Sequence, residues 1–244
     1  MEFAVLREDM VDSLEHETKA VLEDHRVGVA MREVPRHEFV PDERVAYADR
    51  DYDHLGTRIL APSTAAKLLQ ALEPSPGDSV LVVGAGVGYT AAVAAELVGA
   101  AHVHAVDIAR PVVYEARENL ARAGYGEVLV DCRDGARGLP EYAPFDRILV
   151  EAGAIAPPRT LLEQLAPDGR LVYPRGAGAR QRLESVARDG TTTHHGALSF
   201  DPLLVEGEQS GALERNRTAR EDTEYARRHA ETRRGWEQGW LEWD

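Results

Sequence analysis

One stretch of the chain, SVLVVGAGVGYTAAVAAELVG, constrains the fold more than any other. Four apolar residues, Val80–Val83, run directly into three alternate glycines, and a helical pattern of small residues, Tyr89–Val98, follows. Strand, glycine loop and helix in this order let the backbone approach a ligand closely and present free N–H groups to it. We therefore expect a nucleotide-like cofactor to bind where Gly84, Gly86 and Gly88 lie.

The spacing of the glycines indicates which cofactor this is. A dinucleotide-binding loop reads G-x-G-x-x-G, which would need a third glycine at position 89, where this chain has Tyr89. The sequence G-A-G-V-G is instead similar to the glycine loop of S-adenosylmethionine (SAM)-dependent methyltransferases. The next segment, AHVHAVD, predicts a strand ending at Asp107, and an acid about twenty residues past the loop suits the hydroxyls of a ribose.

Apolar runs alternate with helical patterns from residue 78 onward, which predicts an α/β fold. We expect a mainly parallel, Rossmann-like sheet with helices on both faces. A hairpin at its edge is expected at 182–187 and 192–200, around an Asp-Gly turn. The other expected strands are 79–83, 102–107, 127–131, 145–151 and 170–173, and the expected helices of the sheet are 89–98, 111–123 and 158–166.

The chain is expected to divide into three parts. Residues 1–60 would form a helical extension and a segment that covers substrate and cofactor, and residues 61–205 would form the SAM-binding core. Residues 206–244 are rich in Arg and Glu at helical spacing and predict a charged helical tail. Trp236 and Trp240 would share one face of that helix, either docked on the body or serving as a lid or partner contact.

The charge of the chain limits its partners. Asp and Glu number 42 against 28 Lys and Arg, which gives a net charge of −14, and only Lys19 and Lys67 are lysines. An acid-rich, lysine-poor surface keeps a protein hydrated in concentrated salt, so we expect a halophilic, archaeal source; an ordinary acidic enzyme is the alternative. Such a surface repels phosphates and argues against nucleic acid as the main partner.

Cysteine usage and hydropathy indicate a cytoplasmic protein. Cys132 is the single cysteine, so an intramolecular disulfide is excluded, and we expect this side chain to be a small buried apolar group. No apolar run reaches the length of a membrane span, and the first residues lack the features of a secretion signal. His102 and His104 share a strand face but have no third ligand beside them, so no metal site is expected.

Several longer motifs resemble one family, the protein-L-isoaspartate O-methyltransferases, which use SAM to methylate isoaspartyl carboxylates in damaged proteins. The resemblance runs from about residue 27 to residue 200, and VPR-x-x-FVP and GLPEYAPFD are its most specific parts. The motifs that carry it are Val34–Pro41, Ala46–Pro62, Val80–Ala95, Asp134–Pro158 and Gln164–Gly176.

The resemblance implies roles for individual residues. The three loop glycines would cradle the methionine part of SAM, and Asp107 would hold the ribose. Asp134, by its side chain, and Gly135, by its backbone N–H, would meet the adenine edge. Asp134 follows the third expected strand, at the carboxyl edge where ligands sit in open α/β sheets, although an Asp-Gly pair is also a common turn.

The chain departs from the family pattern near the expected methyl acceptor. Family members carry G-Q-T-I-S before an x-P pair, and Leu60 stands where that serine is thought to sit at the reacting centre. Thr57 and Arg58 are the nearest candidates to replace the lost hydroxyl, Arg58 by pairing with a carboxylate. Asp201 adds an acid near the acceptor that would repel a carboxylate unless paired, and Val82 replaces an acid found in many members.

A carboxylate acceptor is already ionised near neutral pH, so this chemistry needs alignment and exclusion of water and no general base. We therefore expect a protein-repair methyltransferase acting on isoaspartyl residues. Glu151, at the end of the fourth expected strand, is a secondary candidate for the acceptor pocket. Two alternatives remain: a diverged methyltransferase with a small-molecule or RNA acceptor, and a non-catalytic SAM-binding module.

Overall fold

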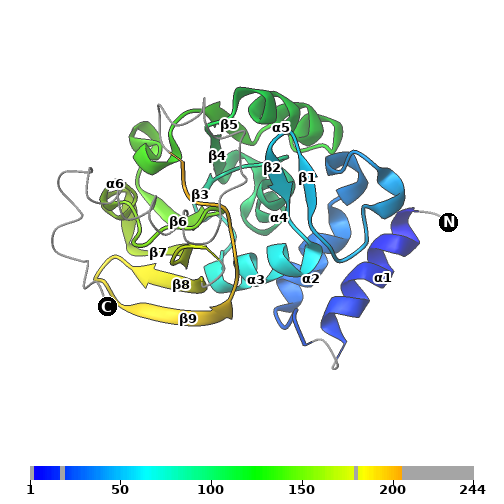
Figure 1. The fold of residues 1–244 in the computed structure, drawn as a ribbon, viewed down its shortest axis with the longest axis horizontal. Coiled ribbons are helices and arrows are strands. Elements are labelled where there is room, and N and C mark those ends of the chain that lie inside the picture. Colours follow the sequence, from blue (N-terminus) through cyan, green and yellow to red (C-terminus); the bar gives the residue numbers. More distant parts are fainter. Residues whose placement is uncertain (1–2, 17–19, 179–180, 205–244) are drawn as a thin grey trace.

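The computed structural model describes residues 3–16, 20–178 and 181–204 (Figure 1). Within these residues seven strands form one sheet in the order β5-β4-β3-β6-β7-β8-β9. Neighbours from β5 to β7 run parallel, and β8 and β9 add an antiparallel hairpin at the edge. The strands are β3 (Val80–Val83), β4 (Val103–Asp107), β5 (Leu129–Cys132), β6 (Phe145–Val150), β7 (Leu165–Arg175), β8 (Arg182–Ala187) and β9 (Thr192–Ala197).

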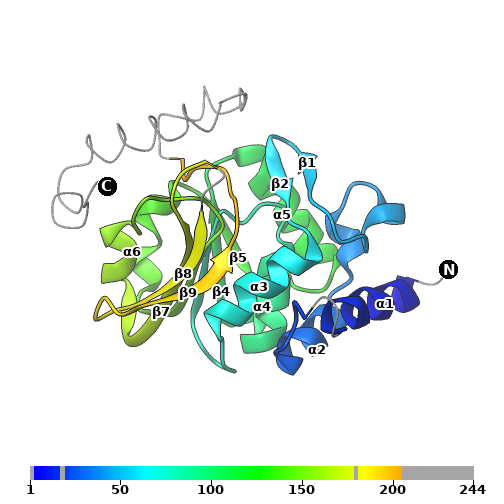
Figure 2. The ribbon, with the colours of Figure 1, turned by 60° about the horizontal axis from the view of Figure 1, so that its bottom comes forward.

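Helices cover both faces of the sheet unequally (Figure 2). Val80 and Val82 point into a large apolar cluster that they share with α3, α4 and α5, while Leu81 and Val83 point into a smaller one that they share with α6. This alternation follows from the two-residue period of a strand that is buried on both faces. The helices are α1 (Phe3–Glu15), α2 (His25–Glu33), α3 (Pro62–Leu72), α4 (Tyr89–Val98), α5 (Arg110–Arg122) and α6 (Arg159–Glu163).

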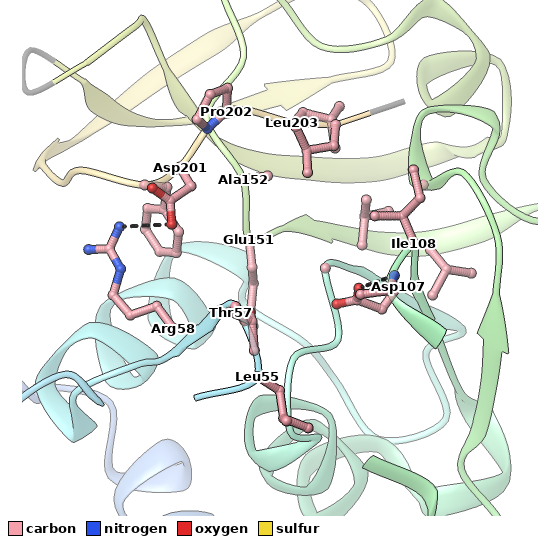
Figure 3. A pocket seen from close by; sticks show the side chains of 18 of the residues that line it. Leu55, Thr57, Arg58, Asp107, Ile108, Glu151, Ala152, Asp201, Pro202 and Leu203 are labelled. Carbon is pink, nitrogen blue, oxygen red and sulfur yellow. Dashed lines mark hydrogen bonds and ion pairs between the residues drawn. The ribbon is translucent and has the colours of Figure 1, made fainter. Parts of the chain in front are cut away.

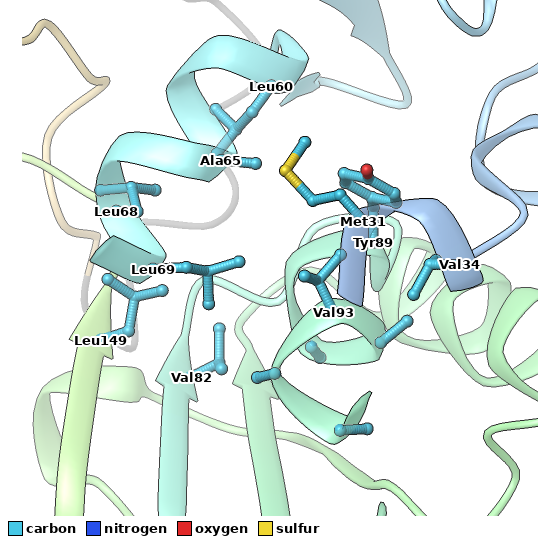
Figure 4. Packing of buried hydrophobic residues seen from close by; sticks show 14 of the residues in the cluster. Met31, Val34, Leu60, Ala65, Leu68, Leu69, Val82, Tyr89, Val93 and Leu149 are labelled. Carbon is cyan, nitrogen blue, oxygen red and sulfur yellow. The ribbon is translucent and has the colours of Figure 1, made fainter. Parts of the chain in front are cut away.

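The N-terminal helices belong to the same core as the sheet. Leu14 on α1 and Met31 on α2 are fully buried in the large cluster. Figure 4 shows Met31 beside residues of α3 and α4. Arg32 links the two N-terminal helices because its guanidinium pairs with Glu8, Asp12 and Glu15 of α1. Burial of this apolar face is what holds helices of such modest length in place.

Two short strands precede α3 in a segment that the sequence predicts to be irregular. They are β1 (Tyr52–His54) and β2 (Thr57–Ile59), which pair as an antiparallel hairpin. Leu55 and Gly56 form its turn, with φ angles of 48° and 73°. Positive φ at both central residues gives the twist that a two-residue hairpin needs. The described residues also form short 3₁₀ helices at Arg36–Phe39, Glu43–Val45, Ala100–His102, Gly135–Arg137 and Pro140–Tyr142.

Three expectations from the sequence are corrected by the structure. The helix expected at 158–166 ends at Glu163, because Leu165 already pairs with Phe145 in β7. The outer strand of the edge hairpin ends at Ala197. Cys132 is exposed and not a buried apolar group. The expected charged tail lies outside the described residues, and no helix within them is long and apolar enough to cross a membrane.

Candidate active site

A cavity of about 350 Å³ lies at the carboxyl edge of the parallel strands (Figure 3). The sheet contributes Asp107 at the end of β4 and Glu151 directly after β6. The β1–β2 hairpin contributes Thr57 and Arg58, and residues 200–204 complete the wall. Open α/β sheets bind ligands at this edge, so the topology alone makes this cavity the candidate site.

The three predicted glycines differ in position. Gly84 lines the cavity, whereas Gly86 and Gly88 do not. The N–H of Gly86 donates to Asp107 Oδ2 over 3.1 Å, which ties the loop to the end of β4. Gly88 begins α4 with φ of 94°, and a Cβ there would lie 3.2 Å from Leu120 Cγ, so this glycine lets α4 and α5 pack closely.

Asp107 is fixed with its carboxylate at the cavity. Oδ1 accepts a hydrogen bond from the N–H of Ala109 over 2.9 Å, and Oδ2 accepts the bond from Gly86. Each carboxylate oxygen can accept more than one hydrogen bond, so this geometry also suits the two hydroxyls of a ribose. Ile108 follows Asp107 and lines the cavity as well; sequence reasoning missed it, although its place next to the acid was the available signal.

Of the two residues predicted to meet adenine, Gly135 lines the cavity and Asp134 does not. Asp134 does not line the cavity; its carboxylate caps a 3₁₀ turn by accepting from the N–H of Ala136 over 2.9 Å, and it is 9% exposed. Gly135 does line the cavity. Its backbone lies so close to Val83 that any side chain at position 135 would collide with the Val83 methyl group. Gly135 is therefore required here for close approach to β3.

Arg58 bridges two walls of the cavity. Its guanidinium pairs with Asp51 at 3.6 Å and Asp201 at 3.7 Å, and it donates to the carbonyl of Ser199 over 3.2 Å. Asp201 is therefore paired with a cation, which reduces the expected repulsion between Asp201 and a substrate carboxylate. Figure 3 shows Arg58 and Asp201 facing each other at one side of the cavity.

Leu60, where the family resemblance implies a serine, belongs both to the cavity wall and to the apolar core. It lines the cavity, yet it is only 8% exposed and packs into the large apolar cluster (Figure 4). Its carbonyl accepts a hydrogen bond of 2.6 Å from Arg36, which is fully buried and also donates to the carbonyl of Ala46. The Arg36 guanidinium lies 4.4 Å from the ring centroid of Tyr89, at the start of α4. Arg36 lies in the VPR-x-x-FVP motif, and nothing in that motif predicts that its side chain would join Leu60 to Tyr89.

Glu151 is the most unusual group in the cavity. Its Oε1 atom is buried without a hydrogen-bond partner. Burial raises the pKa of its carboxyl group to about 8, and the negative charge of Asp107 adds to this shift, while a hydrogen bond from Thr90 opposes it. A carboxyl group that is neutral at pH 7 is typical of a functional site.

The residues present fit SAM. The cavity volume lies within the range of roughly 300–1,000 Å³ usual for small-ligand sites. Gly84 opens the loop toward the cavity, Asp107 is placed for a ribose, and the unpartnered Glu151 oxygen is placed for a positively charged group. Across the described residues, no cluster of three or more His, Cys, Asp or Glu side chains is arranged to hold a metal ion.

Known proteins match both the sequence and the fold. The family model described as protein-L-isoaspartate(D-aspartate) O-methyltransferase matches residues 6–202. The protein-L-isoaspartate O-methyltransferase of Aeropyrum pernix is 45% identical over 81% of this chain and 78% of its own length. The protein of the same name from Methanosarcina mazei is 43% identical over 82% of each.

A solved structure agrees in fold. The Plasmodium falciparum structure described as a protein-L-isoaspartate O-methyltransferase, in complex with S-adenosyl-L-homocysteine, has a TM-score of 0.73. It covers 81% of this chain and 98% of its own, at 21% identity, so it shows the fold alone. Together with the family match over most of the described residues, these likenesses show that the chain belongs to the protein-L-isoaspartate(D-aspartate) O-methyltransferase family and has its SAM-dependent methyltransferase fold.

Proposed function

We propose that this chain transfers a methyl group from SAM to the isoaspartyl carboxylates of damaged proteins, and that both substrates meet in the cavity described above. The observation that carries the proposal is that one cavity joins Asp107 and Gly84, on the cofactor side, to Thr57 and Arg58, on the acceptor side. Membership of the family and relatives above 40% identity support the activity.

The cofactor side would be formed by the glycine loop and the ends of β3, β4 and β6. Asp107 would hold the ribose, and Gly135, which packs against Val83 at the cavity wall, would offer its backbone N–H to the adenine edge. Asp134 acts through the turn that it caps, because its side chain does not reach the cavity. When bound, SAM supplies a methyl group carried on a cationic sulfur.

The acceptor side needs to bind and orient a carboxylate and to exclude water. Arg58 provides a cation with a planar donor fork, which suits a carboxylate. Its present partners are half-exposed, and such exposed ion pairs contribute only about 0–1 kcal/mol, so a substrate carboxylate can displace Asp201 at small cost. Leu60 and Phe200 provide apolar walls that keep water out.

A methyl-transfer assay tests this proposal. Labelled SAM is incubated with an isoaspartyl peptide in molar salt, and the same peptide with a normal aspartyl residue serves as the matched control. We expect label in the isoaspartyl peptide only. Transfer no greater than to the aspartyl control, in protein that binds SAM by calorimetry, would contradict the proposed acceptor.

A different acceptor is the second candidate, and two observations favour it. Leu60 removes the hydroxyl that the family uses, and Arg58 is already occupied by Asp51 and Asp201. Failure with the isoaspartyl peptide but turnover of a small-molecule or RNA acceptor would identify a diverged methyltransferase. Binding of SAM without transfer to any acceptor would identify a non-catalytic module.

A further inference from the structure

Glu151 lies beside the glycine loop although it comes from a different strand. Its backbone N–H donates to the carbonyl of Val83, the last residue of β3, over 2.8 Å. A Cβ at Gly84 would lie 3.5 Å from the Cβ of Glu151, so the two residues are in contact. The side chain lines the cavity and is drawn there in Figure 3. An acid is therefore placed next to the loop expected to hold the methionine part of the cofactor.

Within the part of the chain that the structure describes, this acid has no positively charged partner. Its Oε1 atom is buried without a hydrogen bond, and among the described residues no Arg, Lys or His forms an ion pair with it. Its ionisable neighbour on β4 is Asp107, which is itself acidic. The other charged groups lining the cavity are Arg58 on β2, Arg110 on α5 and Asp201, and Arg58 is engaged by Asp51 and Asp201.

A buried carboxyl oxygen without a hydrogen-bond partner costs folding free energy, because the protein does not replace the hydrogen bond that water supplied. A positively charged ligand in the cavity would remove that cost. The methionine end of SAM carries two such charges, the sulfonium and the ammonium group. β3 brings no acid to this place, since Val82 is fully buried in the cluster facing the helices.

We propose that Glu151 is the carboxylate that pairs with the positive charge at the methionine end of SAM. The inference rests on the proposed function only in its assignment of SAM to this cavity, and the identity of the methyl acceptor does not enter it. Glu151 is then a cofactor-binding residue supplied by β6, at a place where the neighbouring strand β3 is apolar.

The proposal has a consequence for protons, whose sign follows from the burial of Glu151. Because burial raises its pKa to about 8, the ligand-free carboxyl group holds a proton at pH 7. A bound cation favours the ionised form and lowers this pKa. Binding of SAM at pH 7 therefore releases a proton, the affinity for SAM rises with pH, and both effects disappear well above pH 8.

Calorimetry measures this release directly. SAM is titrated into the protein at pH 7 in phosphate and in Tris, whose ionisation enthalpies differ, and the difference in heat gives the number of protons released. We expect wild-type protein to release close to one proton more than Glu151→Gln, which should bind SAM roughly tenfold or more weakly, one pKa unit being tenfold. Any titration of the ligand's own amino group cancels in the difference between the two proteins.

S-adenosyl-L-homocysteine distinguishes the two positive charges of SAM. It keeps the ammonium group and lacks the sulfonium. Extra proton release with SAM alone supports pairing with the sulfonium, and release with both ligands supports pairing with the ammonium. Glu163→Gln is the matched control, because Glu163 is exposed on α6 and pairs only with Arg159 across the helix surface; it should behave as wild type.

The folding of the variant is checked without ligand. The pKa of Glu151 is higher in the folded than in the unfolded protein, so wild-type stability falls as pH rises from about 4.5 through about 8. Glu151→Gln lacks this loss and should unfold at an equal or higher temperature than wild type at pH 8. Proton release by wild-type protein at pH 7 that vanishes at pH 9 provides a test that needs no variant.

Two results would overturn the proposal. Equal proton release and equal affinity in wild type and Glu151→Gln would overturn it alone, leaving SAM binding intact. No heat of binding with wild-type protein would overturn both this proposal and the cofactor assignment. Absence of methyl transfer to an isoaspartyl peptide, with the expected proton release present, would contradict only the proposed acceptor.

Discussion

Leu60 shows how one residue can belong to a core and to a substrate site together. Its side chain packs in the large apolar cluster and also lines the cavity next to Thr57. A serine at this position would present a hydroxyl to the acceptor but would lose apolar contacts. We therefore expect activity and stability to move in opposite directions when the family residue is restored.

Leu60→Ser should raise the rate of isoaspartyl methylation roughly 2- to 10-fold, the value of one added hydrogen bond. The same change should destabilise the protein by about 2–5 kcal/mol through lost burial. Peptide methylation kinetics and denaturant unfolding measure the two effects. Leu60→Ala is the matched control: it opens the same space without a hydroxyl, so an equal gain in rate would mean that space, and not the hydroxyl, is limiting.

The positions of individual residues around the cavity could be predicted to different degrees. Asp107 was identified because an acid after a buried strand has a position fixed by the topology. The different position of Asp134 could not be foreseen, because an Asp-Gly pair caps a turn as readily as it meets a ligand. The unpartnered Oε1 atom of Glu151 could not be predicted from the sequence either, because burial depends on packing between β3, β4 and β6.

The β1–β2 hairpin is the element that closes the acceptor side of the cavity. Its attachments include the contact of His54 with Glu115 on α5 at 2.8 Å, the hydrogen bond from the N–H of Ala61 to Asp51, and the contacts of Arg58 with Asp201 and with the carbonyl of Ser199. The sequence predicted an irregular segment here, because strands of three residues leave almost no periodic pattern and Leu55-Gly56 is not a common turn pair.

The Arg58–Asp201 pair predicts a specific change in substrate binding. If Arg58 binds the acceptor, Asp201 competes with it, so Asp201→Asn should lower KM for an isoaspartyl peptide roughly 2- to 10-fold, while Arg58→Lys should raise it. Steady-state kinetics on the peptide measure both. Asp189→Asn, in the exposed turn between β8 and β9, is the control. An increase in KM for Asp201→Asn would show that Asp201 orients Arg58 and does not compete.

The parallel sheet was predictable from the sequence, but the unequal packing of helices on its two faces was not. Apolar runs such as Val80–Val83 define buried strands directly. Among the described residues, the second face carries the short helix α6 and turns, because β7 is an eleven-residue strand that takes up the residues expected to finish that helix. Competition between strand pairing and helix formation is a tertiary effect that local periodicity does not reveal.

The net charge of −14 leads to a prediction for the entire chain. Mutual repulsion of acidic groups opposes folding at low salt, and added salt screens it. We expect the unfolding temperature to rise when KCl is increased from about 0.1 M, and to keep rising to about 2 M if the surface is adapted to salt. A thermal unfolding series in KCl measures this. A plateau or decline above about 0.5 M would favour an ordinary acidic enzyme.

The position of the buried Arg36 bears on how binding of SAM affects binding of the methyl acceptor. Its guanidinium lies against Tyr89, which starts the helix after the glycine loop, and it also holds the carbonyl of Leu60 on the acceptor wall. Arg36 therefore contacts the residue that follows the glycine loop and the backbone of the acceptor wall at the same time. We expect a cofactor that orders the glycine loop also to order the backbone at Leu60, so that binding of SAM favours binding of the acceptor.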